Sequence, residues 1–201
     1  MALSHNALAF IAAVLTLAGF IPYILSILRG QTRPHIYSWL IWAIATVVVG
    51  AAQWVSGGGV GAWVTLFSGV ITCGIVWLTW LRFDSLHIKP IDALFLIVAA
   101  CALPAWYFTD NPLVAVVLLT LVDIAGFGPT FRKSYHTPFG ENLTLFYLVC
   151  VRNLVAAAAL EHYSLTTLMF PVVIALANAV FVGLVHWRRF CLLAQGASRG
   201  S

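Results

Sequence analysis

Seven stretches of mostly apolar residues, each about 20 residues long, follow one another along the chain with only short breaks between them. A helix of about 20 apolar residues is long enough to cross the hydrocarbon core of a bilayer. In a chain of 201 residues, this pattern leaves no length for a separate soluble domain. We therefore expect an all-α integral membrane protein with spans over residues 5–28, 36–55, 61–81, 91–107, 113–131, 141–160 and 165–187.

The composition excludes several other classes of protein. Hydrophobic residues make up 62% of the chain, charged residues 8%, and the mean hydropathy is +1.00, which no soluble domain carries without a very large exposed apolar surface. The net charge of +4 is spread over the chain without a basic run long enough to bind nucleic acid. The four cysteines show no CxxC spacing, so neither a disulfide framework, a metal site nor a cofactor is expected.

The positive charges give the expected orientation in the membrane. Lysine and arginine residues near span ends are retained on the cytoplasmic side. They follow the first, third, fifth and seventh expected spans, whereas the loops after the second, fourth and sixth spans contain none. The N-terminus is therefore expected outside and the C-terminus in the cytoplasm. Short loops and the lack of a targeting segment favour a bacterial inner membrane.

An internal repeat is expected because one shift of the sequence aligns three pairs of helices. Moving the chain by 107 residues pairs LAGFIP (residues 17–22) with IAGFGP (residues 124–129). The same shift, without a gap, pairs WLRF (residues 80–83) with WRRF (residues 187–190). Clusters of identities at equivalent points of three helices predict two related halves.

The repeat predicts a particular topology. After three spans the chain is on the opposite side of the membrane from where it began. A second three-helix unit therefore has the same orientation as the first only if one extra helix lies between them. We expect two parallel three-helix bundles, over residues 1–83 and 111–190, joined by an inverting helix in residues 84–110, with a polar tail over residues 191–201. In parallel repeats of this kind the solute path lies between the halves, near the bilayer midplane.

The 3+1+3 layout, the external N-terminus and a proline late in the first helix of each half resemble the PQ-loop superfamily, which includes the SWEET sugar transporters. Here the motif reads Pro22-Tyr23 and Pro129-Thr130. The resemblance implies that Pro22 and Pro129 act as hinges, since a proline removes one helix hydrogen bond. The alternative is that both prolines end helices near the membrane surface.

A layer of polar residues is expected at one depth of the membrane. At 1.5 Å rise per residue, Asp123, Arg152, Asn153 and Asn178 lie about ten to thirteen residues from the ends of their spans. Subtracting 107 from the numbers of these residues gives the corresponding positions in the first half, where hydroxyl-bearing residues lie at or beside them. The substrate-binding residues expected from this layer are Thr16, Thr46, Thr72, Asp123, Arg152, Asn153 and Asn178.

The two charged members of the layer have two alternative uses. An ionisable group at the midplane costs about 2.5–3.5 kcal/mol on insertion scales, so it is expected to face the bundle interior and find a partner. Asp123 and Arg152 either form a fixed ion pair or bind a polar or charged solute, with Asp123 exchanging a proton as the site opens and closes.

Three neighbouring side chains also leave alternatives. Residues adjacent on a helix point about 100° apart, so only one of Arg152 and Asn153 is expected to face the cavity directly. Asn178 matches an asparagine on the last helix of the SWEET pattern, which contacts sugar; the alternative for Asn153 and Asn178 is hydrogen bonding between helices. Trp42 either lines the cavity or serves as an anchor or packing residue.

These features predict a transporter of a small polar solute, with protons as a further candidate partner. The resemblance does not assign sugar as the solute, because the third span has Ser68 and Thr72 where SWEETs have an asparagine. The alternative is a seven-helix receptor or sensor of the same fold, as in the KDEL-receptor branch. No enzyme is expected, since the sequence shows no metal cluster, paired-aspartate site or Ser/His dyad at matching depth in the membrane. Homo-oligomerisation stays open.

Overall fold

The computed structural model describes residues 4–30, 34, 36–82, 90–136, 138–140 and 143–199. This part of the chain is helical and contains no strand, which confirms the all-α class. Each expected span corresponds to one α-helix. The elements are α1 (His5–Leu28), α2 (Ile36–Val55), α3 (Gly59–Arg82), α4 (Pro90–Thr109), α5 (Pro112–His136), the 3-10 turn η1 (Pro138–Gly140), α6 (Leu143–Ala158) and α7 (Leu165–Arg199).

Long apolar helices indicate a membrane protein. Within the described ranges, four helices are long and apolar enough to cross a bilayer: α1, α2, α3 and residues Leu165–Ala194 of α7. The apolar parts of α4, α5 and α6 are shorter, over Leu96–Thr109, Pro112–Ala125 and Leu143–Ala158. Seven complete crossings therefore stay a prediction.

The last helix extends beyond the expected span. The seventh span was expected to end at Trp187, with a polar tail over residues 191–201, but α7 continues as a helix to Arg199. Helical hydrogen bonds lie within the backbone, so a helix does not have to end where its apolar sequence ends. Residues 191–199 are thus part of α7, and residues 200–201 lie outside the described residues.

Local sequence explains where two of the helices begin. Ser4 caps α1, because its hydroxyl accepts a hydrogen bond of 3.2 Å from the backbone N–H of Ala7. At α5, the side chain of Asn111 accepts a 3.0 Å hydrogen bond from the backbone N–H of Leu113. Pro112 occupies the first position of α5, where its missing N–H costs nothing.

The two motif prolines lie inside helices. Pro22 is an internal residue of α1, which continues to Leu28. Residue 129 lies within the bounds of α5, which continue to His136, although the side chain of Pro129 is outside the described part. The alternative in which these prolines end their helices is therefore wrong. Their action as hinges stays a prediction.

The helices pack in two corresponding groups. In the first, α3 contacts both α1 and α2; in the second, α7 contacts both α5 and α6. Between the groups, α1 contacts α6, α2 contacts α5, α3 contacts α6 and α2 contacts α7. Exchanging α1 with α5, α2 with α6 and α3 with α7 leaves this set of contacts unchanged. The remaining helix, α4, packs against α2 and α5.

The largest apolar core forms where α2, α4, α5 and α7 meet. Its buried members include the small side chains of Ala52, Ala102 and Ala115, together with Leu119 and Phe170. Small residues let helix backbones approach closely, and close van der Waals packing drives helix association in lipid. This core holds α4 against both groups of helices.

Two loops meet at one end of the molecule, residues 56–58 between α2 and α3 and residues 159–164 between α6 and α7. The backbone N–H of Val60 donates to the Glu161 carboxylate at 3.1 Å, and the Glu161 N–H donates to the Gly58 carbonyl at 3.2 Å. Nearby, Gln53 of α2 donates a 2.7 Å hydrogen bond to the Thr167 carbonyl of α7. We call these contacts the loop junction. The Glu161 carboxylate also complements the N-terminal dipole of α3.

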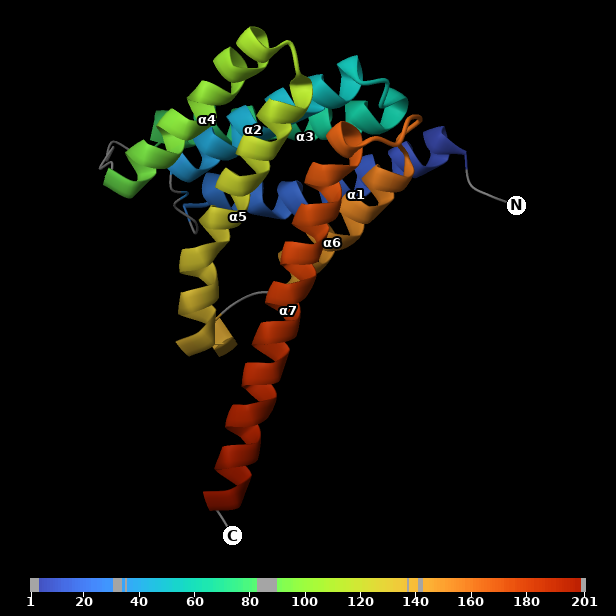
Figure 1. Cartoon of the computed structure of the whole chain (residues 1–201). Coiled ribbons are helices and arrows are strands. Elements are labelled where there is room, and N and C mark those ends of the chain that lie inside the picture. Colours follow the sequence, from blue (N-terminus) through green and yellow to red (C-terminus); the bar gives the residue numbers. More distant parts are fainter. Residues whose placement is uncertain are drawn as a thin grey trace.

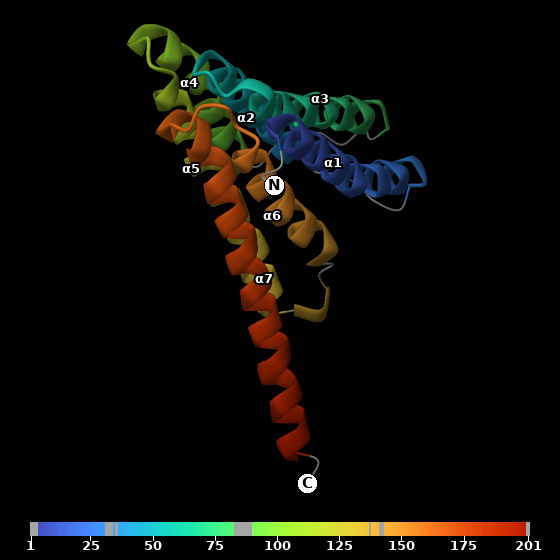
Figure 2. The same cartoon turned by 90° about the vertical axis from the view of Figure 1, so that its right-hand side faces the viewer.

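The opposite ends of the two groups diverge. In Figure 1, α1, α2 and α3 run across the view, whereas α5 and α7 descend from it. Figure 2 shows the same divergence after rotation, with the C-terminal ends of α3 and α7 far apart. The two groups are therefore joined at the loop junction and splayed at the ends expected to face the cytoplasm.

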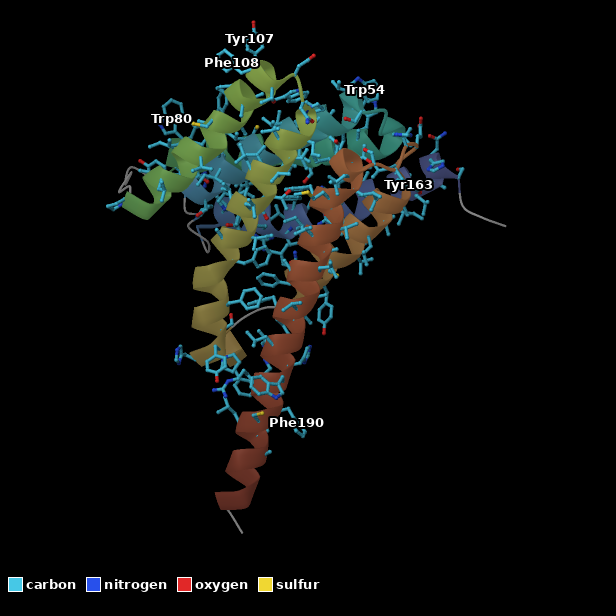
Figure 3. The ribbon with its side chains drawn as sticks, in the orientation of Figure 1. Trp54, Trp80, Tyr107, Phe108, Tyr163 and Phe190 are labelled. Atoms are coloured by element: carbon cyan, nitrogen blue, oxygen red, sulfur yellow. The ribbon has the colours of Figure 1, made fainter. Side chains whose placement is uncertain are left out.

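Large aromatic side chains cover the outside of the helices. Trp54, Trp80, Tyr107, Phe108 and Phe190 point away from the body in Figure 3, and each exposes close to half or more of its surface. A soluble monomer rarely exposes this much contiguous apolar surface. Such a surface is compatible with lipid, where aromatic residues gather near the two membrane interfaces.

We expect Gly61→Ala to weaken the loop junction. A Cβ atom on Gly61 would lie 2.6 Å from the backbone nitrogen and 2.8 Å from the Cα of Leu160, so the two backbones have to separate. Overpacking of this kind costs about 1–3 kcal/mol of stability. Thermal unfolding of the purified protein in detergent measures the loss as a lower Tm.

Gly74→Ala is the matched control in the same helix. A Cβ atom on Gly74 meets nothing within 4 Å, and alanine is the better helix former by about 0.5–1 kcal/mol. Its Tm is expected to be unchanged or higher. Equal Tm values for the two variants would contradict the close approach at Gly61.

Candidate functional site

A cavity of about 240 Å³ lies where six helices converge. Its walls come from α1, α2, α3, α5, α6 and α7. The structure brings nearly all of the sequence-predicted site residues to this one place. Those that line the cavity are Trp42, Thr46, Thr72, Asp123, Arg152, Asn153 and Asn178.

Arg152 is held between two helices. Its side chain is 9% exposed; Nε donates to the Thr16 hydroxyl of α1 at 3.2 Å, and Nη1 donates to Asn153 Oδ1 at 3.0 Å. The third nitrogen, Nη2, is buried and has no hydrogen-bond partner among the described residues. Thr16 thus belongs to the site through Arg152, although it is not itself among the lining residues.

Asp123 lies in the same wall without a charged neighbour in contact. Its side chain is 9% exposed and lines the cavity. Within the described part of the chain, its carboxylate forms no hydrogen bond or ion pair, and none joins it to Arg152. The alternative of a fixed ion pair between Asp123 and Arg152 is therefore wrong for this conformation. Depth along a helix placed both groups at one level but did not give their lateral separation.

The two asparagines hydrogen-bond within their own helices. Asn153 donates to the Val149 carbonyl and Asn178 to the Ile174 carbonyl, both at 2.8 Å. The alternative, in which these amides donate hydrogen bonds to another helix, is therefore wrong for both residues. The expectation that only one of Arg152 and Asn153 faces the cavity is also wrong, because both line it. The long arginine side chain bends back over its neighbour, which the 100° rule for Cα positions does not consider.

The threonines share one hydrogen-bond pattern. Thr16, Thr46 and Thr72 each donate to the carbonyl four residues earlier, at 2.8, 2.6 and 2.8 Å. Since each hydroxyl proton is used in this way, the hydroxyl oxygen is left as an acceptor. Thr16 uses that oxygen for Arg152; Thr46 and Thr72 present theirs at the cavity wall.

Aromatic residues form much of the remaining wall. Trp42 lines the cavity rather than serving only as an anchor, and its ring centroid lies 5.3 Å from that of Trp39 in an edge-to-face arrangement. Trp39 in turn donates from Nε1 to the Tyr23 hydroxyl at 3.2 Å. The sequence prediction missed the aromatic lining residues Phe20, Trp39, Phe127, Phe146 and Phe170.

The missed residues carry a signal that was present in the sequence. Four pairs of lining residues are separated by the same 107 positions that align the two halves. The match between LAGFIP and IAGFGP already pairs Phe20 with Phe127. The four pairs are Phe20 with Phe127, Trp39 with Phe146, Trp42 with Val149, and Thr46 with Asn153.

The polar groups of the cavity are suited to hydrogen bonding. Among the described residues, no three histidine, cysteine, aspartate or glutamate side chains gather closely enough to hold a metal ion. The cavity offers one guanidinium, one carboxylate, two amides and several hydroxyl oxygens. Such groups hydrogen-bond a small solute.

Comparisons of the chain with protein-family models, curated proteins and solved structures find no significant match.

We expect Thr16→Val to destabilise the protein by removing the acceptor for Arg152 Nε. A buried donor left without a partner costs about 1–3 kcal/mol, and more when it is charged. Thr79→Val is the matched control, because Thr79 is equally buried and donates to the Ile75 carbonyl without contacting Arg152. A larger fall in Tm for Thr16→Val is expected; equal falls would show that the contact contributes nothing.

Proposed function

We propose that the chain is a membrane transporter of a small polar solute and that it works by alternating access between two three-helix repeats. The observation that carries this proposal is the composition of the cavity wall. Four pairs of lining residues are related by one 107-residue shift. A cavity built from equivalent positions of two halves lies on their common axis, where parallel-repeat transporters bind their solutes.

The helix contacts support two repeats of the same arrangement. In each group the third helix packs against both others, and the contacts between groups are unchanged when the groups are exchanged. Residues 1–83 and 111–190 would form the repeats, and α4 would be the inverting helix between them. No described side chain of α4 lines the cavity, as expected for a connecting helix. The residue pattern thus favours the 3+1+3 layout of the PQ-loop and SWEET-like transporters.

The shape supports a state open to one side. The loop junction joins the two groups at one end, and the other ends diverge (Figures 1 and 2). With the N-terminus outside and the C-terminus in the cytoplasm of a bacterial cell, the junction faces outward and the splayed ends face inward. This arrangement would be an inward-open conformation.

The hinge proposal gains support from the position of the prolines. Phe20 and Phe127 line the cavity. Each is followed two residues later by a motif proline, Pro22 or Pro129. A bend at these positions would move the cytoplasmic ends of α1 and α5 relative to the cavity. Both repeats would therefore bend next to the bound solute.

Proton coupling is a further part of the proposal. Asp123 is the only carboxylate among the described residues that line the cavity. Its equivalent in the first half is Thr16, so the two halves differ in charge at this point. A proton that binds Asp123 in one state and leaves in the other would couple solute movement to the proton gradient.

Flux into liposomes tests this function. Protein reconstituted with a trapped pH indicator is expected to move protons together with an added solute. In Asp123→Asn, proton movement is expected to disappear and the pH dependence of solute uptake to flatten, because the amide cannot exchange a proton. Asp110→Asn removes an exposed carboxylate outside the cavity and serves as the control.

The outcomes separate the two functional classes. Solute uptake with unchanged pH dependence in Asp123→Asn would exclude proton coupling. A solute that raises the Tm but shows no flux would favour the receptor or sensor alternative.

Chemical labelling tests the orientation and the closed end. In a variant whose four cysteines, Cys73, Cys101, Cys150 and Cys191, are replaced by alanine, Thr46→Cys places one thiol in the cavity wall. A membrane-impermeant maleimide is expected to label it in inverted vesicles and not in intact cells. Adding Glu161→Ala removes one hydrogen bond of the loop junction and is expected to raise labelling in intact cells several-fold. Labelling from outside without that change would contradict the closed outer end.

A further inference from the structure

Two opposite charges face the cavity without neutralising each other. Of the described residues that line it, only Asp123 and Arg152 carry a formal charge. Each residue is 9% exposed and no ion pair joins the two; in the described part of the chain, Arg152 Nη2 has no hydrogen-bond partner. A buried charge without a partner is costly, so a counter-charge from a bound molecule would stabilise each group in its ionised form.

The two groups differ in what they bind. The planar guanidinium matches a carboxylate, which accepts charge-assisted hydrogen bonds from its N–H groups. Thr16 and Asn153 already fix Nε and Nη1, and the free Nη2 remains for an added acceptor. The carboxylate of Asp123 accepts hydrogen bonds only, so it matches an ammonium group.

The remaining wall selects for an apolar substituent. Most other lining residues are aromatic or aliphatic, with Phe20, Trp39, Phe127, Phe146 and Phe170 among them. A volume of about 240 Å³ is smaller than the usual range of about 300–1,000 Å³ for pockets that hold drug-sized ligands. The cavity therefore fits a small molecule with two charges and an apolar part.

We propose that the transported solute is a small zwitterion, with a carboxylate bound by Arg152, an ammonium group bound by Asp123 and an apolar substituent against the aromatic wall. This inference rests on the proposed function and specifies its solute. An α-amino acid with an apolar side chain has this chemistry. A simple anion leaves Asp123 without a partner, a simple cation leaves Arg152 without one, and a sugar supplies neither charge.

Binding to the purified protein tests the proposal without requiring transport. The probes are phenylalanine, phenylpropanoate, which lacks the ammonium group, and phenylethylamine, which lacks the carboxylate. Alanine, propanoate and ethylamine form a second, smaller series. Calorimetry in detergent is expected to show that an amino acid in one of these series binds at least about tenfold more tightly than both singly charged analogues, since each loses one charge-assisted contact.

Charge-removing variants assign each contact. Asp123→Asn is expected to abolish the preference for the amino acid over the analogue that lacks the ammonium group. Arg152→Gln is expected to abolish the preference for the amino acid over the analogue that lacks the carboxylate. If Arg152→Gln does not fold, Arg152→Lys keeps the charge but not the fork of donors, and is expected to bind the amino acid about tenfold more weakly. Asp110→Asn is the control and is expected to keep the affinities of the unaltered protein, because Asp110 is exposed and outside the cavity.

The result that would overturn the proposal is equal binding of all three members in both series, or no binding of either amino acid to folded protein. Liposome flux distinguishes this outcome from failure of the proposed function. Flux of another solute together with no amino acid binding contradicts the zwitterion and keeps the transporter. Selective amino acid binding without flux supports the zwitterion site and contradicts transport.

Discussion

A buried arginine links the two groups of helices, and the cavity depends on it. Arg152 of α6 donates to Thr16 of α1, so a charged side chain from one group is held by the other. In an apolar environment such a contact is retained because the alternative is an unsatisfied charge. Thr16 and Asn153 hold two of the three guanidinium nitrogens and leave the third for a ligand. The same interactions that join α1 to α6 thus also position the charged group of the proposed binding site.

In the proposed repeat, equivalent positions supply the apolar walls of the cavity, and the positions that differ supply its charges. Phe20 and Phe127 occupy matching positions and supply similar apolar walls. Thr16 and Asp123 occupy positions related by the same 107-residue shift, but their side chains differ. The Thr16 hydroxyl accepts a hydrogen bond from Arg152, whereas Asp123 supplies a carboxylate. A strictly symmetric site would bind a symmetric solute. In the proposed site, the charge difference would give the solute one orientation.

The sequence predicted the helices and most of the polar residues of the candidate site, because both depend on distance along the chain, but it missed most of the apolar wall. Helix length and depth at 1.5 Å per residue placed Asp123, Arg152 and Asn178 at one level, and all three line the cavity. Depth does not give direction around a helix, so the ion pair between Asp123 and Arg152 was a wrong alternative. The extension of α7 to Arg199 was missed because apolar sequence ended earlier than helical hydrogen bonding did.

The length of α7 has a mechanical consequence. With 35 residues at about 1.5 Å each, α7 is about 52 Å long, and its first turn is fixed at the loop junction by the hydrogen bond from Gln53 to the Thr167 carbonyl. A rotation about that end displaces each residue in proportion to its distance from it. The cavity residues Ile174 and Asn178 lie close to the pivot, whereas Arg188 and Arg189 lie far from it. A rotation about the loop junction therefore displaces Arg188 and Arg189 about twice as far as Asn178, so the basic end of the helix moves more than the cavity wall does.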